Sequence, residues 1–109
     1  MNRLKKNGRT LKFLQKASPP VQKSILEKAP RDLIDCLCDC AHNILKGNVP
    51  LTSRHKQKLR RHKKALRDLT KRKTSLASKR KIVQKGGFLS VLLSALAPVL
   101  GGLIGGLTK

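Results

Sequence analysis

Apolar side chains recur at helical spacing over the first 47 residues. The longest pattern begins after Pro30 and places seven of them within a stripe of about 140° at 100° per residue: Leu33, Ile34, Leu37, Cys38, Ala41, Ile44 and Leu45. The opposite face is weakly acidic and carries Asp32, Asp35, Asp39 and Asn43. Gly47 and Asn48 follow, as is typical of a helix end. The pattern predicts an amphipathic helix that buries one side.

Two shorter helices are predicted upstream. Ser18 stands before Pro19 and Pro20, which favours a helix start because a side-chain oxygen can cap free amides and proline fits the first turn. The apolar residues that follow at helical spacing are Val21, Ile25 and Leu26. Another short helix is predicted around Thr10, Leu11, Phe13 and Leu14.

A second amphipathic pattern runs from Ser53 to Lys73. Thr52 is a good N-cap and no helix-breaking residue follows, so the pattern predicts one continuous rod of about 32 Å at roughly 1.5 Å per residue. A narrow stripe along the rod carries Leu59, His62, Leu66 and Leu69, with His55 beside it. We expect this leucine stripe to pack on the first helical unit and to leave the rest of the circumference in solvent.

The last apolar pattern is continuous rather than periodic. Residues 88–107, FLSVLLSALAPVLGGLIGGL, are uncharged and long enough to span a bilayer as a helix. Pro98 and the glycines weaken such a helix. A stable anchor, a membrane-active or self-associating tail and a removable tail all remain open. Two glycine pairs have the spacing of close-packed membrane helices, namely Gly101 with Gly105 and Gly102 with Gly106.

Together these patterns predict a mainly α-helical protein in three parts. Residues 1–47 form a short helical unit, a small bundle. Residues 48–85 form a basic DNA-binding helical segment with a long basic helix. Residues 86–109 form an apolar, glycine-rich C-terminal tail that is detached from the rest. Few large apolar side chains are available to offset chain entropy, so the bundle is expected to be marginally stable.

Charge narrows the function. The chain carries 26 Lys and Arg against 5 Asp and Glu, a formal net charge of +21 on 109 residues. The natural partner of this surplus is a polyanion, whether nucleic acid, an anionic membrane or an acidic protein. The chain has no Trp, no Tyr and 2 Phe, which excludes the stacking platform of a single-strand binder. Without a catalytic arrangement of nucleophile and base, we expect a non-enzymatic protein with no cofactor.

The surplus is concentrated in residues 48–85, where a single acid, Asp68, accompanies fifteen Lys and Arg. Double-stranded DNA presents about one phosphate charge per 1.7 Å, so roughly nineteen phosphates lie along the predicted rod, which could offset about half of them. Such contacts predict strong salt dependence and no sequence preference. A merely solvated charged face is the competing interpretation. The candidate DNA-binding residues are Arg54, Lys56, Lys58, Arg60, Arg61, Lys63, Lys64, Arg67, Lys71, Arg72, Lys73, Lys79, Arg80 and Lys81.

Three cysteines alternate along the helix predicted after Pro30. Cys38 is expected to point into the apolar stripe, whereas Cys36 and Cys40 lie together at its edge. The three thiols therefore do not converge on one ion, and no metal site is predicted. Small, buried and reduced side chains are expected instead. The histidines expected to be packing or surface residues are His42, His55 and His62.

A resemblance emerges from two stretches, KGNVPLTSRHKQKLRRHKKAL from Lys46 to Leu66 and QKGGFLSVLLSALAPVLGGLIGG from Gln84 to Gly106. They resemble the adenovirus minor core protein X, the precursor of the mu peptide, and more closely the related proteins of polintons and adintoviruses. Together they cover less than half of the chain. The resemblance implies a virion protein that condenses the genome with the major core protein. The chain departs from the family in its longer, partly acidic N-terminal helical unit and its greater use of lysine.

The resemblance also implies processing by the viral cysteine protease, which cuts after an aliphatic residue, any residue and then Gly-Gly. Leu103-Ile104-Gly105-Gly106 before Leu107 fits this pattern fully. Gln84-Lys85-Gly86-Gly87 before Phe88 lacks the aliphatic residue.

These observations favour a DNA-condensing viral core protein of the virion and the host nucleus. Two basic triplets, Lys71-Arg72-Lys73 and Lys79-Arg80-Lys81, have the form of a two-part nuclear import signal. The alternative is a tail-anchored or membrane-active protein whose basic segment binds anionic lipid. An RNA-associated protein is disfavoured by the apolar tail and the missing aromatics. Expected partners are double-stranded DNA and other viral core or capsid proteins, with membrane contact or self-association through residues 88–107.

Overall fold

The computed structural model describes residues 2–47, 49, 51–85 and 87–97, with side chains from residue 6 onward. This part of the chain is mainly helical and contains no strand. The helices follow in the order α1 (Asn2–Lys16), α2 (Pro19–Glu27), α3 (Arg31–Leu45), α4 (Ser53–Arg60), α5 (Lys63–Thr70) and α6 (Leu76–Val83). Residues 88–97 form a further helical segment.

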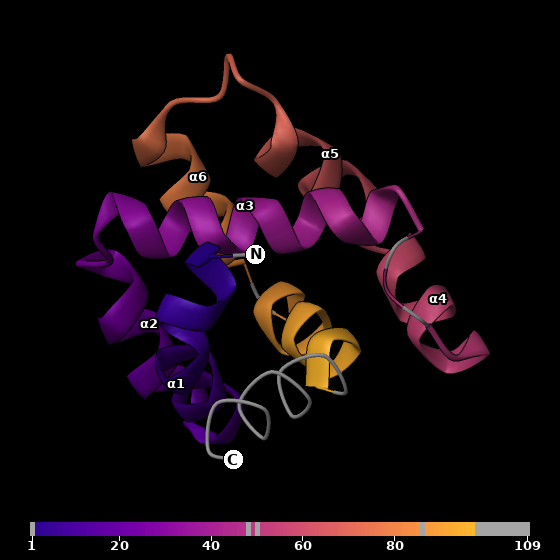
Figure 1. Ribbon diagram of the computed structural model, residues 1–109, viewed down its shortest axis with the longest axis horizontal. Coiled ribbons are helices and arrows are strands. Elements are labelled where there is room, and N and C mark those ends of the chain that lie inside the picture. Colours follow the sequence, from indigo (N-terminus) through magenta and orange to yellow (C-terminus); the bar gives the residue numbers. More distant parts are fainter. Residues whose placement is uncertain (1, 48, 50, 86, 98–109) are drawn as a thin grey trace.

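Helix α3 lies at the centre of the structure (Figure 1) and contacts α1, α5 and α6. Because neighbours cover it on more than one side, its buried face spans about 160° of the wheel at 100° per residue. This face is also rotated from the predicted one. Cys38 is half-buried and Leu45 is 43% exposed. The buried residues of α3 are Leu33, Ile34, Cys36, Leu37, Cys40, Ala41 and Ile44.

Both predicted upstream helices are present, and α2 begins at the predicted position. Ser18 is the N-cap of α2 with an extended backbone, but its side chain makes no capping hydrogen bond. The predicted boundary is therefore confirmed while the predicted capping interaction is wrong. The upstream helix is longer than predicted. In α1, Leu11 and Leu14 are fully buried, whereas Phe13 is 57% exposed.

The predicted rod from Ser53 to Lys73 is wrong, because the chain turns at Arg61 and His62 between α4 and α5. Like charges three or four residues apart, such as Arg60 and Lys64, destabilise a continuous helix. Tertiary packing then decides the path of the chain, since most helix stability in proteins comes from a buried face. The turn still leaves the predicted leucine stripe buried, with Leu59, Leu66 and Leu69 at 5%, 3% and 0% exposure.

The predicted detachment of the C-terminal tail is wrong for its first part. Residues 88–97 form a helix whose apolar side chains belong to the same buried cluster as those of α1 and α3. The side-chain amide of Gln15 in α1 donates to the backbone oxygen of Leu93 over 2.7 Å. This helix therefore contributes to the same core as the N-terminal helices. The buried residues are Phe88, Leu89, Leu92, Leu93, Ala95 and Leu96.

Within the described residues, no helix is both long and apolar enough to cross a membrane. Residues 98–109, which include the glycine pairs between Gly101 and Gly106, lie outside the described residues.

Replacing Leu92 with alanine tests the place of residues 88–97 in the core. Leu92 is fully buried, so Leu92→Ala should lower the free energy of unfolding by about 2–5 kcal/mol. Urea unfolding followed by circular dichroism measures the change. Ser94→Ala, at an exposed position of the same helix, should change it by less than about 0.5 kcal/mol. Equal stability of the two variants would mean that this helix is detached from the core.

Candidate nucleic-acid interface

Helix α4 carries the first group of exposed cations. Its start is fixed by Thr52, whose hydroxyl oxygen accepts a hydrogen bond from the backbone amide of His55 over 3.1 Å, as predicted for an N-cap. Leu59 is the buried residue of this helix. Apart from the half-buried His55, the rest of the helix faces solvent and displays Arg54, Lys56, Lys58 and Arg60.

The turn between α4 and α5 is held by short-range bonds and an aromatic contact. The backbone amide of His62 donates to the oxygen of Leu59 over 3.0 Å, and the amide of Leu66 donates to the oxygen of His62 over 2.9 Å. The His62 ring packs on the Phe88 ring with the centroids 5.6 Å apart. Gly87 precedes this contact with a φ of 80°, a conformation that favours glycine. The C-terminal helix therefore supports the bend in the basic segment.

Helix α5 separates apolar and basic residues sharply. Ala65, Leu66 and Leu69 are buried, and α5 packs against α3. The other side of α5 exposes Lys63, Lys64 and Arg67.

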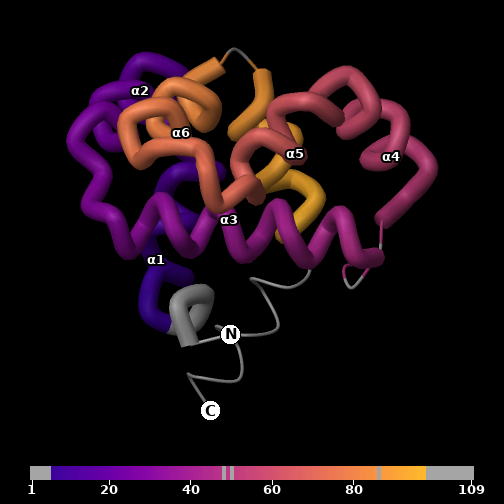
Figure 2. The backbone as a smooth tube through the Cα atoms, turned by 90° about the horizontal axis from the view of Figure 1, so that it is seen from above, coloured from indigo at the N-terminus to yellow at the C-terminus, as the bar shows by residue number. Residues whose placement is uncertain are grey.

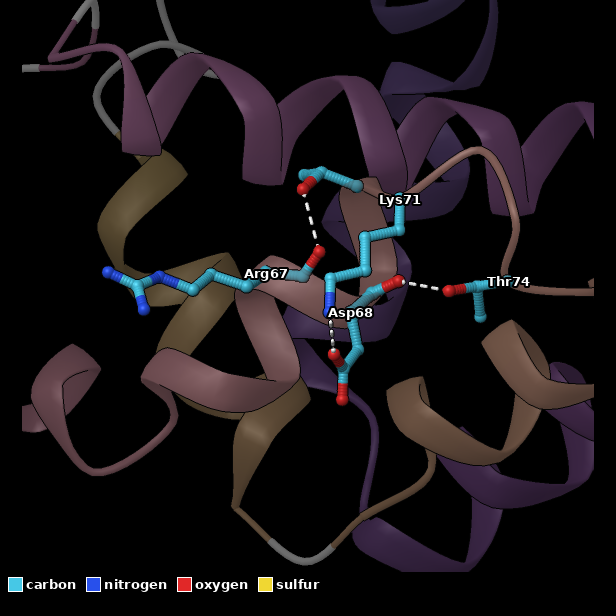
Figure 3. A network of polar contacts seen from close by, with 5 residues as sticks. Arg67, Asp68, Lys71 and Thr74 are labelled. Atoms are coloured by element: carbon cyan, nitrogen blue, oxygen red, sulfur yellow. Dashed lines mark hydrogen bonds and ion pairs between the residues drawn. The ribbon is translucent and has the colours of Figure 1, made fainter.

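Asp68, the single acid of the basic segment, is held at the end of α5 (Figure 3). Its carboxylate forms an ion pair with Lys71, with Oδ1 and Nζ 3.2 Å apart, and its backbone oxygen accepts from the Thr74 hydroxyl over 2.7 Å. The hydroxyl of Thr70 donates to the backbone oxygen of Arg67 over 2.8 Å. Asp68 is thus already paired with one lysine of the basic segment.

Helix α6 contains the two predicted site residues that are not free on the surface. Arg80 donates from Nε and Nη2 to the backbone oxygen of Ala29, over 3.1 and 2.7 Å, and so ties α6 to the segment between α2 and α3. Lys79 is half-buried beside the thiol of Cys38. Lys81 is exposed. The second basic triplet of the predicted import signal therefore lies in α6, and its middle residue, Arg80, is held by hydrogen bonds to the backbone.

The structure exposes the remaining predicted site residues. They extend from α4 through α5 and the following loop to α6, and together they form what is here named the basic surface. Its members are Arg54, Lys56, Lys58, Arg60, Arg61, Lys63, Lys64, Arg67, Lys71, Arg72, Lys73 and Lys81.

Helix α1 carries a second group of cations that the sequence analysis missed. Figure 1 shows α5 above α3 and α1 below it, and Figure 2 shows from above that α1 crosses beneath α3; each of the two helices contacts α3. The sequence signal was available, since α1 contains six Lys and Arg and no acid. Among its side chains, Lys6, Arg9 and Lys16 are exposed and Lys12 is half-buried.

The cysteines occupy places different from those predicted. Cys36 and Cys40 are buried rather than at the edge of the buried face, and Cys38 is at the edge instead, because α3 is rotated as described above. A hydrogen bond with the Cys36 side chain and burial raise the pKa of the Cys40 thiol. Burial also raises the pKa of the Cys38 thiol, and nearby Lys79 opposes this shift. Within the described residues, no cluster of His, Cys, Asp or Glu could hold a metal ion.

The three histidines have different surroundings. His42 is exposed, and His55 and His62 are half-buried. The Nδ1 atom of His55 is buried without a hydrogen-bond partner in the described structure, and His62 packs on Phe88.

The structure describes most of one candidate processing site and none of the other. At the weaker match, Gly87 is exposed but Phe88, on the other side of the bond, is fully buried. Cleavage there would require local opening of the core. Gly86 and the stronger match, Leu103-Ile104-Gly105-Gly106, lie outside the described residues.

Replacing Arg80 tests whether its hydrogen bonds to Ala29 stabilise the fold, in contrast to a cation exposed on the surface. Arg80→Met removes both hydrogen bonds to Ala29 and should lower the free energy of unfolding by about 1–2 kcal/mol, because charged hydrogen bonds contribute at this level when partly screened by solvent. Lys81→Met makes the same change in charge at an exposed neighbour and should leave stability within about 0.5 kcal/mol of the original. Urea titration checks both, and equal losses would mean that the Arg80 contact contributes nothing.

No protein-family model, curated protein or solved structure matches the chain.

Proposed function

We propose that the chain coats and condenses double-stranded DNA without reading its sequence, as a minor core protein of a virion. One observation carries this proposal. All the Lys and Arg residues between Ser53 and Lys73 are exposed, while the one acid among them, Asp68, is paired with Lys71. A solvated surface normally mixes positive and negative charges, whereas this surface is almost entirely positive.

The bend between α4 and α5 changes how the basic surface would meet a duplex. Each of these helices has 8 residues and is about 12 Å long at roughly 1.5 Å per residue. Phosphates would therefore be contacted from two short helices and a loop rather than along one rod. With about six to ten such contacts, affinity would fall about 10³- to 10⁵-fold between 50 and 200 mM salt.

The chemistry of the basic surface supports contact with phosphates rather than with bases. Base reading depends on side chains placed to form paired hydrogen bonds in the major groove. Here α4 and α5 each bury their leucines against the core, and their free faces carry mainly long, flexible cations. Such a surface supports binding without sequence preference.

Condensation requires that one molecule contact more than one duplex. Helix α1, which exposes Lys6, Arg9 and Lys16, lies on the side of α3 opposite to α5 (Figures 1 and 2). If one duplex bound on each side of the protein, the cations would neutralise phosphate charge on both duplexes and draw them together. This arrangement supports a bridging role for α1.

The resemblance to the adenovirus-type precursor supports further parts of the proposal. Processing would occur after Gly106, and the protein would act in the virion and the host nucleus. Membrane activity of residues 88–107 is the competing function. It would require that residues 88–97 leave the core, in which six of them are buried.

Binding of the full chain to a duplex of random sequence tests the proposal. We expect a slope of log affinity against log salt between about −5 and −9, from six to ten phosphate contacts at about −0.9 each. Arg60→Gln with Lys64→Gln should make the slope shallower by about 1.8. Fluorescence anisotropy over a salt series measures these slopes.

The matched control for this binding experiment is Lys23→Gln with Lys28→Gln. It removes the same charge from exposed positions in and just after α2 and should leave the slope nearly unchanged. A wild-type slope shallower than about −2, together with leakage of anionic liposomes, would replace DNA binding by the membrane function.

Compaction of long DNA tests the bridging role of α1. Arg9→Gln with Lys16→Gln should leave binding to a short duplex within about twofold of the original, because the basic surface is intact. The same variant should need severalfold more protein to compact a long duplex, as seen by light scattering. Compaction by this variant at the wild-type concentration would show that α1 does not bridge. The α2 variant again serves as the control.

A further inference from the structure

We propose that a cavity of ≈ 260 Å³ between α3 and α6 binds a multiply charged phosphate group, the kind present in inorganic polyphosphate and at the 5′-phosphorylated end of a nucleic acid. The cavity is lined by four basic residues, Arg31, Arg72, Lys73 and Lys79. The cavity shares Arg72 and Lys73 with the basic surface but contains no residue of α4 or α5, and binding of a phosphate group there does not depend on the function proposed above.

The charge of the cavity indicates the class of ligand. Asp35 is the single carboxylate among its lining residues, so the lining has a formal excess of three positive charges. Asp32, which follows Arg31 in the sequence, is engaged elsewhere, since it accepts from the Asn7 amide over 3.0 Å and lies 3.8 Å from Nζ of Lys6. An internal phosphodiester carries one negative charge. A phosphate monoester carries about 1.5 to 2 at neutral pH, and a polyphosphate carries more, so both match the excess better.

The loop that forms one wall of the cavity is held in place by hydrogen bonds. The Thr74 hydroxyl donates to the backbone oxygen of Asp68 over 2.7 Å, and the Thr74 amide donates to the oxygen of Lys71 over 3.2 Å. At the start of α6, Ser75 Oγ accepts from the Ser78 amide over 3.2 Å. These bonds position the backbone that carries Arg72 and Lys73. A ligand would therefore bind without ordering this loop, which reduces the entropic cost of binding.

The opposite walls of the cavity are also fixed relative to each other. The Arg80 guanidinium bonds twice to the backbone oxygen of Ala29, two residues before Arg31 at the start of α3. Lys79 is half-buried and lies beside Cys38 of α3. The two helices that carry Arg31 and Lys79 are thus joined beside the cavity that the four cations line.

The lining of the cavity favours a phosphate group rather than a nucleobase. Among the described residues that line it, none is aromatic and Leu76 is the apolar one, so a base would find no surface on which to stack. The hydroxyls of Thr74 and Ser75 add polar contacts at its wall.

Isothermal titration of the full chain with tripolyphosphate, at about 0.15 M salt to screen the open surface, tests the site. We expect saturable binding of one tripolyphosphate per chain. Arg31→Gln with Arg72→Gln should weaken it roughly tenfold or more, because charged hydrogen bonds to the ligand are lost. Arg54→Gln with Arg60→Gln removes the same charge from α4 and should weaken it less than about twofold. All four positions are exposed, and circular dichroism confirms that each variant is folded.

Equal weakening in the two double variants, or only weak binding of many tripolyphosphates, would overturn the proposal. A second arm distinguishes the two sources of the ligand by competition with short duplexes that carry either a 5′-phosphate or a 5′-hydroxyl. Stronger competition by the phosphorylated duplex, lost in Arg31→Gln with Arg72→Gln, assigns the site to nucleic-acid ends. Equal competition by the two duplexes, with tripolyphosphate still bound at the site, assigns it to free polyphosphate. Because duplex binding is measured separately, failure of one proposal leaves the other to stand on its own data.

Discussion

Burial of the broad apolar face of α3 is the interaction on which the rest of the structure depends. A formal net charge of +21 makes every compact state of the chain repel itself, so folding requires enough buried apolar surface to offset that repulsion. Helix α3 supplies it through contacts with α1, α5 and α6, and residues 88–97 join the same cluster. The basic helices are displayed in fixed positions because this core holds them. A bound polyanion would stabilise the fold further, since it binds the native arrangement and lowers the repulsion.

The fold could be predicted from the sequence where periodicity alone decides the outcome. Leu59, Leu66 and Leu69 lie on one stripe in any helical path, so their burial was predictable even though the rod is broken. The break itself was not, because neither proline nor glycine marks it and the contact of His62 with Phe88 involves residues far apart in sequence. The apolar pattern of the sequence also could not predict that residues 88–97 lie in the core. A continuous apolar segment looks the same whether lipid or protein surrounds it.

The candidate site, too, could be predicted from the sequence only in part. Exposure of most cations follows from the high cost of burying charge, and the sequence predicts it well. Arg80 is different, since an arginine within a basic run carries no signal that its guanidinium bonds to the oxygen of Ala29, 51 residues away. The positions of Cys36 and Cys38 depended on which neighbours cover α3. The second group of cations on α1 could have been found, because its composition was visible in the sequence.

The position of residues 88–97 along the chain has a consequence for biosynthesis. Domains generally fold as units while the chain emerges from the ribosome, from the N-terminal end onward. Here the basic segment is translated before the apolar helix that completes the core beneath it. During that interval a nascent polycation without its full hydrophobic support lies next to ribosomal RNA, which is itself a polyanion. The connectivity thus delays completion of the native core until residues 88–97 have been made, and the basic segment lacks part of its buried apolar support until that point.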